Sequence, residues 1–385
     1  MSNEPQLPAA DADSDTHVLV RVVNGIGYLE LERPQALNAL TTAMVRTMRA
    51  ALERWRNDAA VLAVIVRTRH ARAFCAGGDI RFLYESSRAG DQAALDTFFT
   101  DEYRLNHAIA TYPKPYIAFL NGVVMGGGMG ISQGAYRTGG LRIVGASARM
   151  AMPETRIGLF PDVGMGWYLA RTQGALGRYL AVTGETVDAA GALYAGLADV
   201  SLDEAAWPDL FAALEREPFA SGEQIVERIR AAARPADETQ RHADASALAG
   251  ARAWIDRHFS LDDVSAILAS LEAAQRAGQG AEAEWAGQAV GVLRERSPLS
   301  MAVSLEVVSR AEGTISDCLR RDLDLTRSSF ATGDVMEGIR ARIIDKDNRP
   351  HWRIARIEDV RREDVEAMFA SPWSATEHPL RGLIG

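Results

Sequence analysis

Two acidic residues in an apolar stretch are the side chains of this sequence best suited to chemistry. Glu154 and Asp162 lie within residues 150–167, where most of the neighbouring residues are apolar and several prolines and glycines intervene. Such a stretch predicts a shaped loop rather than a long helix or strand. An apolar setting raises the pKa of a carboxyl group, which makes it useful as an acid or base near neutral pH. The alternative is structural, with Glu154 starting a short helix after Pro153 and Asp162 in a Pro-Asp turn.

Two glycine-rich loops upstream indicate where a substrate oxygen could be held. Gly77 and Gly78 precede one predicted helix, and the run Gly126, Gly127 and Gly128 precedes another. A glycine costs about 1 kcal/mol in a helix relative to alanine, so three in succession indicate a close approach to the backbone. Backbone N–H groups from two such loops would form an oxyanion hole if they converged. Taken alone, the pair at 77–78 is explained better by an ordinary left-handed turn before a helix.

The second loop partly matches two other motifs. A dinucleotide-binding fingerprint fails because Gln133 occupies the place of its last glycine. Residues 130–134 match G-x-S-x-G, in which Ser132 would be the nucleophile of a hydrolase. That motif needs a strand directly before it, whereas glycines precede this one, and the later His242 and His258 lie in ordinary charged surroundings.

The elements needed to position these residues follow from hydrophobic periodicity and turn residues. A hairpin around Asn24 and Gly25 and a helix that Thr41 begins are expected first, followed by strands that alternate with helices. From about residue 207 the sequence is rich in alanine, glutamate and arginine and is helical in period. The expected strands are 18–23, 26–31, 61–66, 116–121, 141–144 and 149–152, and the expected helices are 43–55, 80–87, 93–111, 168–181 and 315–330, with a polar, flexible connection at 233–246.

This pattern predicts an α/β fold with three parts. Residues 1–16 are acidic and poor in large apolar side chains, which is typical of a disordered lead-in. Residues 17–206 are expected to form an α/β core that contains the active site, and residues 207–385 a mainly helical C-terminal region. The N-terminus resembles neither a signal peptide nor a transit peptide, and no apolar run reaches transmembrane length, so a cytoplasmic location is expected.

Composition excludes several classes of function. The net charge of −9 argues against a nucleic-acid partner, because phosphate binding requires clustered lysine and arginine. Cys75 and Cys318 are the two cysteines, too few for a disulfide framework or a zinc site, which suits a reducing compartment. The seven histidines are scattered without ligand spacing, so no metal is predicted.

Four segments together resemble the crotonase superfamily, which is also called the enoyl-CoA hydratase/isomerase family. They are residues 33–38, 74–80, 121–130 and 152–166, and a C-terminal run, GDVMEGIRARIIDKDNRPHW at 333–352, extends the resemblance over nearly the whole chain. The resemblance implies the ββα spiral core of that superfamily. It also implies an oxyanion hole for the thioester oxygen of an acyl-CoA, made by the N–H groups of Gly78 and Gly127.

Within the superfamily, the resemblance favours hydrolysis over hydration. Hydratases carry a second catalytic glutamate after the glycine loop, and here Gly130 occupies that position. The closest resemblance is to thioester hydrolases of valine breakdown that release 3-hydroxyisobutyrate and CoA from 3-hydroxyisobutyryl-CoA. It implies that Glu154 and Asp162 are the catalytic acids and that Glu102 binds the substrate hydroxyl. Gly77, Asp79 and Gly126 are implied as further substrate-binding residues.

Two other interpretations remain. One is an enoyl-CoA hydratase or isomerase of the same superfamily. The other is a CoA-ester binding protein without activity, in which the acids are structural. The resemblance implies an acyl-CoA substrate, in which CoA is part of the substrate, and no separate cofactor. No membrane partner is expected, and a homo-oligomer remains an open question.

Overall fold

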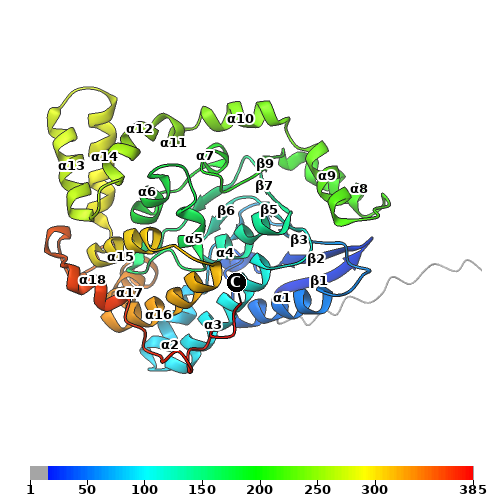
Figure 1. Cartoon of the computed structure of the whole chain (residues 1–385), viewed down its shortest axis with the longest axis horizontal. Helices are drawn as coiled ribbons and strands as arrows, with labels where there is room; N and C mark the ends of the chain where they lie inside the picture. The colour runs from blue at the N-terminus through cyan, green and yellow to red at the C-terminus, as the bar shows by residue number, and fades with distance from the viewer. Residues whose placement is uncertain (1–15, 385) are drawn as a thin grey trace, which may run out of the picture.

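The computed structural model describes residues 16–384. The predicted lead-in, residues 1–16, therefore lies outside the described residues except for Thr16. The described chain contains a six-stranded and a three-stranded sheet with helices packed around them, which confirms the expected α/β fold (Figure 1). Its last strand is β9, and all later described elements are helical.

The larger sheet begins with a hairpin and continues with parallel strands in the order β1-β2-β3-β5-β7-β9. Asn24 and Gly25 form the hairpin turn with φ angles of 51° and 76°, as the Asn-Gly pair predicts. Parallel strands of this kind are buried on both faces, which accounts for their nearly continuous apolar sequences. The strands are β1 (Val18–Val23), β2 (Ile26–Leu31), β3 (Ala63–Thr68), β5 (Tyr116–Leu120), β7 (Leu141–Val144) and β9 (Val200–Ser201).

The smaller sheet has the parallel order β4-β6-β8. Its strands are β4 (Ala73–Cys75), β6 (Val123–Met125) and β8 (Arg149–Ala151). Each of them follows a strand of the larger sheet and precedes a helical segment, so the chain repeats a strand–strand–helix unit. This is the expected ββα spiral, and it places the loops that follow β4, β6 and β8 at one edge of the small sheet.

Helices surround both sheets. In the core region they are α1 (Thr42–Trp55), α2 (Ile80–Arg88), α3 (Gln92–Ala110), α4 (Gly127–Gln133), α5 (Met165–Leu169), α6 (Leu176–Thr183) and α7 (Ala189–Tyr194). After β9 they are α8 (Trp207–Leu214), α9 (Gly222–Ala232), α10 (Ala236–Asp244), α11 (Ala247–Gly250), α12 (Arg252–Phe259), α13 (Val264–Ala277), α14 (Ala281–Glu295), α15 (Pro298–Ser309), α16 (Ile315–Thr332), α17 (Asp334–Ile339) and α18 (Arg362–Met368). The side chain of Thr41 caps α1, as predicted.

Different helices cover the two faces of the larger sheet. On one face α8 and α9 pack against the strands, with the Phe119 ring 5.2 Å from that of Trp207 and 4.7 Å from that of Phe211. The other face belongs to the main core, which α1 and α3 share with the helices after α14. In Figure 1 the late helix α16 lies beside α3, and the two are in contact. The C-terminal helices therefore complete the core in which the site is built.

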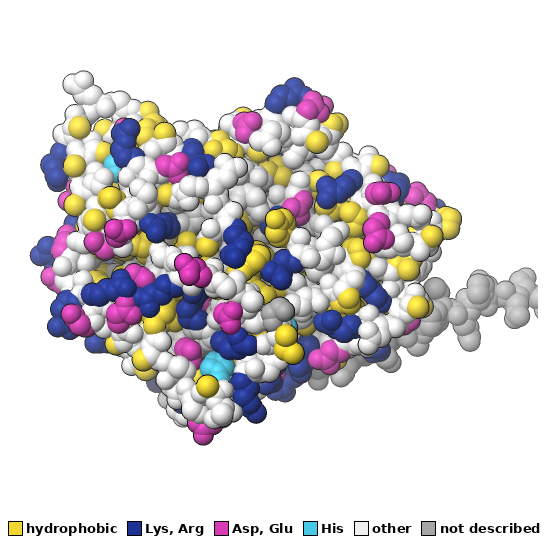
Figure 2. Space-filling model, in the orientation of Figure 1, with side chains coloured by type: hydrophobic (Ala, Val, Ile, Leu, Met, Phe, Trp, Pro, Cys, Tyr) yellow, Lys and Arg dark blue, Asp and Glu magenta, His cyan; other side chains and the backbone are white. Residues whose placement is uncertain are grey.

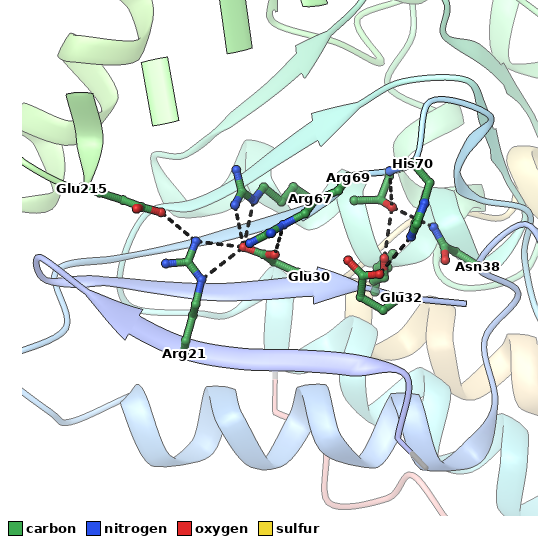
Figure 3. Close-up of polar contacts among 10 residues, drawn as sticks. Arg21, Glu30, Glu32, Asn38, Arg67, Arg69, His70 and Glu215 are labelled. Carbon is green, nitrogen blue, oxygen red and sulfur yellow. Dashed lines mark hydrogen bonds and ion pairs between the residues drawn. The ribbon is translucent and has the colours of Figure 1, made fainter. Parts of the chain in front are cut away.

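A buried ion cluster ties β2 to its neighbours (Figure 3). Glu30, which is fully buried, accepts hydrogen bonds from Arg21, Arg67 and Arg69 at 2.9, 2.6 and 2.7 Å. Arg21 also bonds Glu215 beyond α8 at 2.7 Å. Burial alone would raise the pKa of Glu30, but the bonds from Arg69 and Arg67 outweigh it and hold this pKa at about 2. This carboxylate is a paired, structural one.

Two expectations for local structure were wrong. The helix predicted at 168–181 is two helices, because Gly174 adopts φ 53° between α5 and α6, and Asp256 accepts a hydrogen bond from the N–H of Ala175 at 2.8 Å. The connection predicted at 233–246 contains helix α10, which packs on α7 by burying Ala243. Both depend on contacts with residues distant in sequence, which periodicity does not report.

The surface is mixed in charge. On the face drawn in Figure 2, basic and acidic side chains are interspersed over the helices. Of the described helices, none is both long and apolar enough to span a bilayer. Within residues 16–384, no cluster of three or more His, Cys, Asp or Glu side chains is arranged to hold a metal ion.

Candidate active site

The loops after the three strands of the small sheet enclose a cavity. Because β4, β6 and β8 are parallel, their carboxyl ends meet at one edge. The loop after β4 supplies Gly77 and Gly78, that after β6 supplies Gly126 and Gly127, and that after β8 supplies Glu154. The N–H of Gly126 donates to the carbonyl of Ala151 at 3.3 Å, which joins the second loop to the third.

The cavity has a volume of about 380 Å³ and a mixed lining. Carboxyl groups from three segments face it: Glu102 on α3, Glu154 after β8, and Asp162 in the following loop. Its apolar wall consists of Ile80, Leu83, Phe98, Phe99, Ile157 and Leu159, among others. Two arginines, Arg156 and Arg342, also line it. The structure thus brings together the two acids and both glycine loops singled out in the sequence, together with Glu102, which the family resemblance implied.

The two glycine loops contact each other through backbone atoms. Gly77 has φ 108° and Gly126 has φ 50°, conformations that favour glycine. A Cβ atom added to Gly77 would lie 3.5 Å from the nitrogen of Gly127. In the described part of the chain, the N–H groups of Gly78 and Gly127 donate no hydrogen bond. Both residues line the cavity, so two unengaged backbone donors belong to one small space.

The two glutamates lie directly against the second glycine loop. Glu154 begins a short 3-10 turn (Glu154–Ile157), and its Oε1 would be 2.9 Å from a Cβ on Gly126. The Oε1 of Glu102 would be only 2.4 Å from a Cβ on Gly127. Among the described residues, Oε2 of Glu154 and Oε1 of Glu102 are buried without a hydrogen-bond partner. Glycine at 126 and 127 is therefore what lets both carboxyl groups reach this loop.

Asp162 is the third carboxyl group, and it has a partner. Its Oδ2 accepts a hydrogen bond of 2.6 Å from the hydroxyl of Tyr103, which follows Glu102 on α3. Burial raises the pKa of Asp162 to about 6, although the Tyr103 bond opposes the rise. For Glu154, burial and then the charge of Asp162 raise the pKa well above its ordinary value. Burial and Asp162 raise the pKa of Glu102 likewise.

The three carboxyl groups of the cavity differ from the buried Glu30 in their partners. Three arginines neutralise Glu30, whereas no lysine or arginine among the described residues forms an ion pair with Glu102, Glu154 or Asp162. Burying unpaired carboxyl groups costs stability, so their persistence in one cavity indicates a chemical use. This arrangement can hold, accept and release protons near neutral pH.

The structure does not bring Asp79 into the cavity. Its carboxylate caps α2, with Oδ1 accepting from the N–H of Phe82 at 3.2 Å, and its Oδ2 bonds Arg33 at 2.7 Å. The carboxylate of Asp79 therefore has a structural role at the start of α2, and substrate binding by Asp79 stays a prediction. Aspartate is a preferred N-cap residue, and this preference was the feature of the sequence that indicated the structural role of Asp79.

The structure also argues against Ser132 as a nucleophile. Ser132 lies inside α4, is fully buried, and donates its hydroxyl to the carbonyl of Met129 at 3.0 Å. It does not line the cavity, and helical residues precede it where a nucleophile elbow requires a strand.

Replacing Ser132 with alanine is therefore expected to leave kcat within about twofold of wild type, because a helical hydroxyl bonded to the preceding turn contributes little beyond local stability. A steady-state assay of the turnover of this cavity would check this. A complete loss of turnover in a folded Ser132→Ala variant would contradict it.

Sequence reasoning missed both arginines that line the cavity: Arg342 comes from a distant segment, and Arg156 lies two residues after Glu154. Arg342 belongs to a π-helical turn (Arg340–Ile344) after α17, and its Nη1 bonds Oδ1 of Asn348 at 3.0 Å. Arg156 is exposed, and its guanidinium has no hydrogen bond or ion pair to the described residues. The signal for Arg342 lay within the C-terminal run at 333–352, but nothing in the run places it beside the glycine loops.

Comparison with known proteins agrees with this fold. The family model for enoyl-CoA hydratase/isomerase matches residues 26–369, so the chain belongs to that family of acyl-CoA enzymes. A mitochondrial 3-hydroxyisobutyryl-CoA hydrolase from Homo sapiens is 33% identical over 364 residues, covering 94% of this chain and 91% of the relative. The corresponding protein of Danio rerio is 34% identical over 360 residues, covering 92% and 90%.

Solved structures show the same fold under different names. A carnitinyl-CoA dehydratase from Mycobacterium thermoresistibile has a TM-score of 0.81 at 38% identity and covers 92% of this chain and 96% of its own. An enoyl-CoA hydratase from Rhodobacter sphaeroides has a TM-score of 0.79 at 38% identity and covers 92% and 98%. The family is thus established, while the names of its members divide between hydrolase and hydratase chemistry.

Proposed function

We propose that this protein hydrolyses an acyl-CoA thioester, and that its substrate is 3-hydroxyisobutyryl-CoA, cleaved to 3-hydroxyisobutyrate and CoA in valine breakdown. The observation that carries the proposal is the position of Glu154. Its carboxyl group lies against Gly126 in the same cavity as the unengaged N–H groups of Gly78 and Gly127. The names of the 3-hydroxyisobutyryl-CoA hydrolase relatives support it.

In this proposal the two N–H groups form the oxyanion hole. They bind the thioester oxygen and stabilise the negative charge that develops there when the carbonyl carbon is attacked. One such donor is worth about 3–4 kcal/mol of transition-state stabilisation. The positive φ angles of Gly77 and Gly126 shape the two loops directly before the residues that would donate these N–H groups.

Glu154 then acts in one of two ways. As a general base it takes a proton from water, whose oxygen attacks the carbonyl carbon, and the C–S bond breaks to release the CoA thiolate. As a nucleophile it attacks the carbon itself, and water hydrolyses the resulting mixed anhydride. Trapping with hydroxylamine, or transfer of ¹⁸O from solvent into Glu154, distinguishes the two routes.

The other two acids have separate tasks in this mechanism. Asp162, with its Oδ2 on Tyr103, protonates the leaving thiolate or orients the attacking water. Glu102, whose Oε1 lies unpartnered beside the Gly127 loop, accepts a hydrogen bond from the 3-hydroxyl of the substrate. A buried acceptor without a partner discriminates strongly against an acyl group that lacks the hydroxyl.

Gly130 argues against the hydratase alternative. Hydratases of this family that use two catalytic glutamates carry the second one at this position. Here a Cβ on Gly130 would lie 2.7 Å from Cβ of Val163 and 2.8 Å from Nδ2 of Asn106. The space for a second glutamate is therefore filled. The names of the structural relatives keep hydration as the second candidate function.

The charges along the cavity suit a ligand that is neutral at one end and anionic at the other. The carboxyl groups lie at the glycine loops, while Arg156 and Arg342 line a more exposed part. We propose that these arginines bind phosphate groups of CoA, because guanidinium groups pair well with phosphate oxygens. CoA is then part of the substrate and no separate cofactor is required. A cytoplasmic location, the absence of a nucleic-acid partner and the oligomeric state remain predictions.

The double variant Arg156→Gln with Arg342→Gln is expected to raise KM for the CoA ester about tenfold or more, because a charge-assisted hydrogen bond is worth about 1.5–3 kcal/mol. KM for the same acyl group on pantetheine, which lacks the nucleotide phosphates, should change less than about twofold. Steady-state assays of both thioesters check this, with Arg54→Gln on α1 as the control. An equal rise for both substrates would contradict the phosphate assignment.

A further inference from the structure

Asp162 is held by residues for which the mechanism above has no use. The hydroxyl of Tyr103 on α3 lies 2.6 Å from Asp162 Oδ2 and 2.8 Å from Oγ1 of Thr326 on α16. The Thr326 hydroxyl in turn donates to the backbone carbonyl of Asp322, one helical turn earlier, at 2.8 Å. Tyr103 and Asp322 are fully buried and Thr326 nearly so. A chain of two hydroxyl groups therefore runs from the acid into the C-terminal region.

The same face of α16 also holds the backbone that follows Asp162. Val163 has φ 51° and Gly164 has φ 78°. A β-branched residue at positive φ is strained and persists only where its surroundings fix it. Asp322 does so, because its Oδ2 accepts a hydrogen bond of 2.8 Å from the N–H of Gly164. Asp322 and Thr326 thus fix, from one helix, both the turn and the side-chain partner of Asp162.

Counting donors and acceptors shows what the hydroxyl chain allows. Because the Thr326 hydroxyl donates to the Asp322 carbonyl, its oxygen is left as an acceptor for Tyr103. The Tyr103 hydroxyl has one proton to donate and two neighbouring atoms that could accept it, Oδ2 of Asp162 and Oγ1 of Thr326. When Asp162 is ionised, Tyr103 donates to Oδ2. When Oδ2 is protonated, it donates to the Tyr103 oxygen, and the Tyr103 proton turns to Thr326.

We propose that Tyr103 and Thr326 are positioning residues that let Asp162 change its protonation state without leaving a buried hydrogen-bonding group unsatisfied. Two hydroxyl groups change orientation, and no proton passes along the chain. The extra proton on Asp162 comes from, and returns to, the cavity side. This inference rests on the proposed function, and within it on the route in which Asp162 protonates the leaving thiolate and takes a proton back from the cavity.

Asp162 does not titrate alone. Glu102 faces it from α3, Glu154 from the 3-10 turn, and Asp322 with Arg321 from α16. The pH dependence of the enzyme therefore reports apparent pKa values of the group rather than of one residue. Removing either hydroxyl leaves every one of these charges in place, so the hydroxyl variants isolate the effect of the chain.

The test is the pH profile of kcat/KM for two variants that act in opposite directions. Tyr103→Phe removes the donor to ionised Asp162 and is expected to move the Asp162-dependent limb upward by about one pH unit. Thr326→Val removes the acceptor that Tyr103 uses when Asp162 is protonated, so the limb is expected to move downward by a smaller amount. Thr326→Ser keeps the hydroxyl and should restore the wild-type profile. Tyr112→Phe removes a different tyrosine hydroxyl, bonded to the Leu52 carbonyl, and should not move it.

Shifts of the pH profile in opposite directions for the two variants support the proposal. Shifts in the same direction, or lower activity on an unmoved profile, would overturn it. The infrared C=O stretching band that Asp162→Asn removes gives a second reading of the same shifts without turnover. If Tyr103→Phe does not fold, the downward shift in Thr326→Val decides alone. A folded wild-type protein that cleaves no acyl-CoA thioester would overturn the proposed function instead, and the infrared titration would still decide on the hydroxyl chain.

Discussion

Replacing Glu154 with glutamine is expected to lower kcat for thioester hydrolysis by about 10³-fold or more while the CoA ester still binds. Glutamine keeps the shape of the side chain but can neither take a proton from water nor attack the thioester, and a positioned base contributes about 10²–10⁴-fold. Stopped-flow or steady-state thiol release measures the rate, and calorimetric titration with the CoA ester measures binding.

The matched control is Glu53→Gln on α1, whose side chain is 62% exposed and lies outside the cavity. It should leave both rate and binding unchanged. Near-normal turnover by a folded Glu154→Gln variant would contradict the assignment of Glu154, whereas joint loss of binding and rate would indicate that the change disrupts the cavity.

The same substitution is expected to stabilise the fold at neutral pH. Burial raises the folded-state pKa of Glu154 above its unfolded value, so between these values the folded protein binds more protons than the unfolded chain. The free energy of unfolding therefore falls as pH rises through that window. Glutamine removes this dependence, so the gain in Tm should grow as the pH rises above about 4.3, the ordinary pKa of glutamate, and shrink toward that pH. A gain that grows as the pH falls would contradict the raised pKa.

The second large effect is expected from Gly127→Ala, with a loss of about 10²-fold or more in kcat/KM. The added Cβ would lie 2.4 Å from Oε1 of Glu102 and 3.1 Å from Cδ1 of Leu40, so the start of α4 or Glu102 must move. Either movement displaces the N–H group assigned to the oxyanion hole. Turnover and Tm are measured together, because overpacking also costs about 1–3 kcal/mol of stability.

Gly291→Ala is the control for a helical glycine. Gly291 lies within α14 with no heavy atom within 4 Å of its would-be Cβ. Alanine there should raise stability by up to about 1 kcal/mol and leave turnover unchanged. If Gly127→Ala were as active as Gly291→Ala, the N–H of Gly127 would not be needed to bind the substrate oxygen.

The sequence was sufficient to predict the parts of this site that depend on local pattern. The glycine runs at 77–78 and 126–128 marked the two loops, and Glu154 and Asp162 stood out because they are charged residues in an apolar loop. Because neighbouring parallel strands end at the same edge of a sheet, the loops that follow them lie close together. The structure places these loops around one cavity.

What could not be predicted depends on contacts between segments distant in the chain. The sequence does not show that Arg342 lines the cavity, that Tyr103 bonds the Asp162 side chain, or that Asp322 bonds the turn after it. The structural role of Asp79 could not be predicted for a related reason. Its place beside two glycines fits a ligand contact and a helix cap equally, and only the pairing with Arg33 decides between them.

The central claim, that the cavity hydrolyses a 3-hydroxyacyl-CoA thioester, is tested most directly by thiol release from a small panel of CoA esters. The panel contains 3-hydroxyisobutyryl-CoA, isobutyryl-CoA without the hydroxyl, and crotonyl-CoA as a hydratase substrate. We predict rapid thiol release from the first, at least about tenfold slower release from the second, and no loss of enoyl absorbance from the third. Loss of that absorbance without thiol release would show a hydratase instead, and binding of all three esters without turnover would show that the acids are not catalytic.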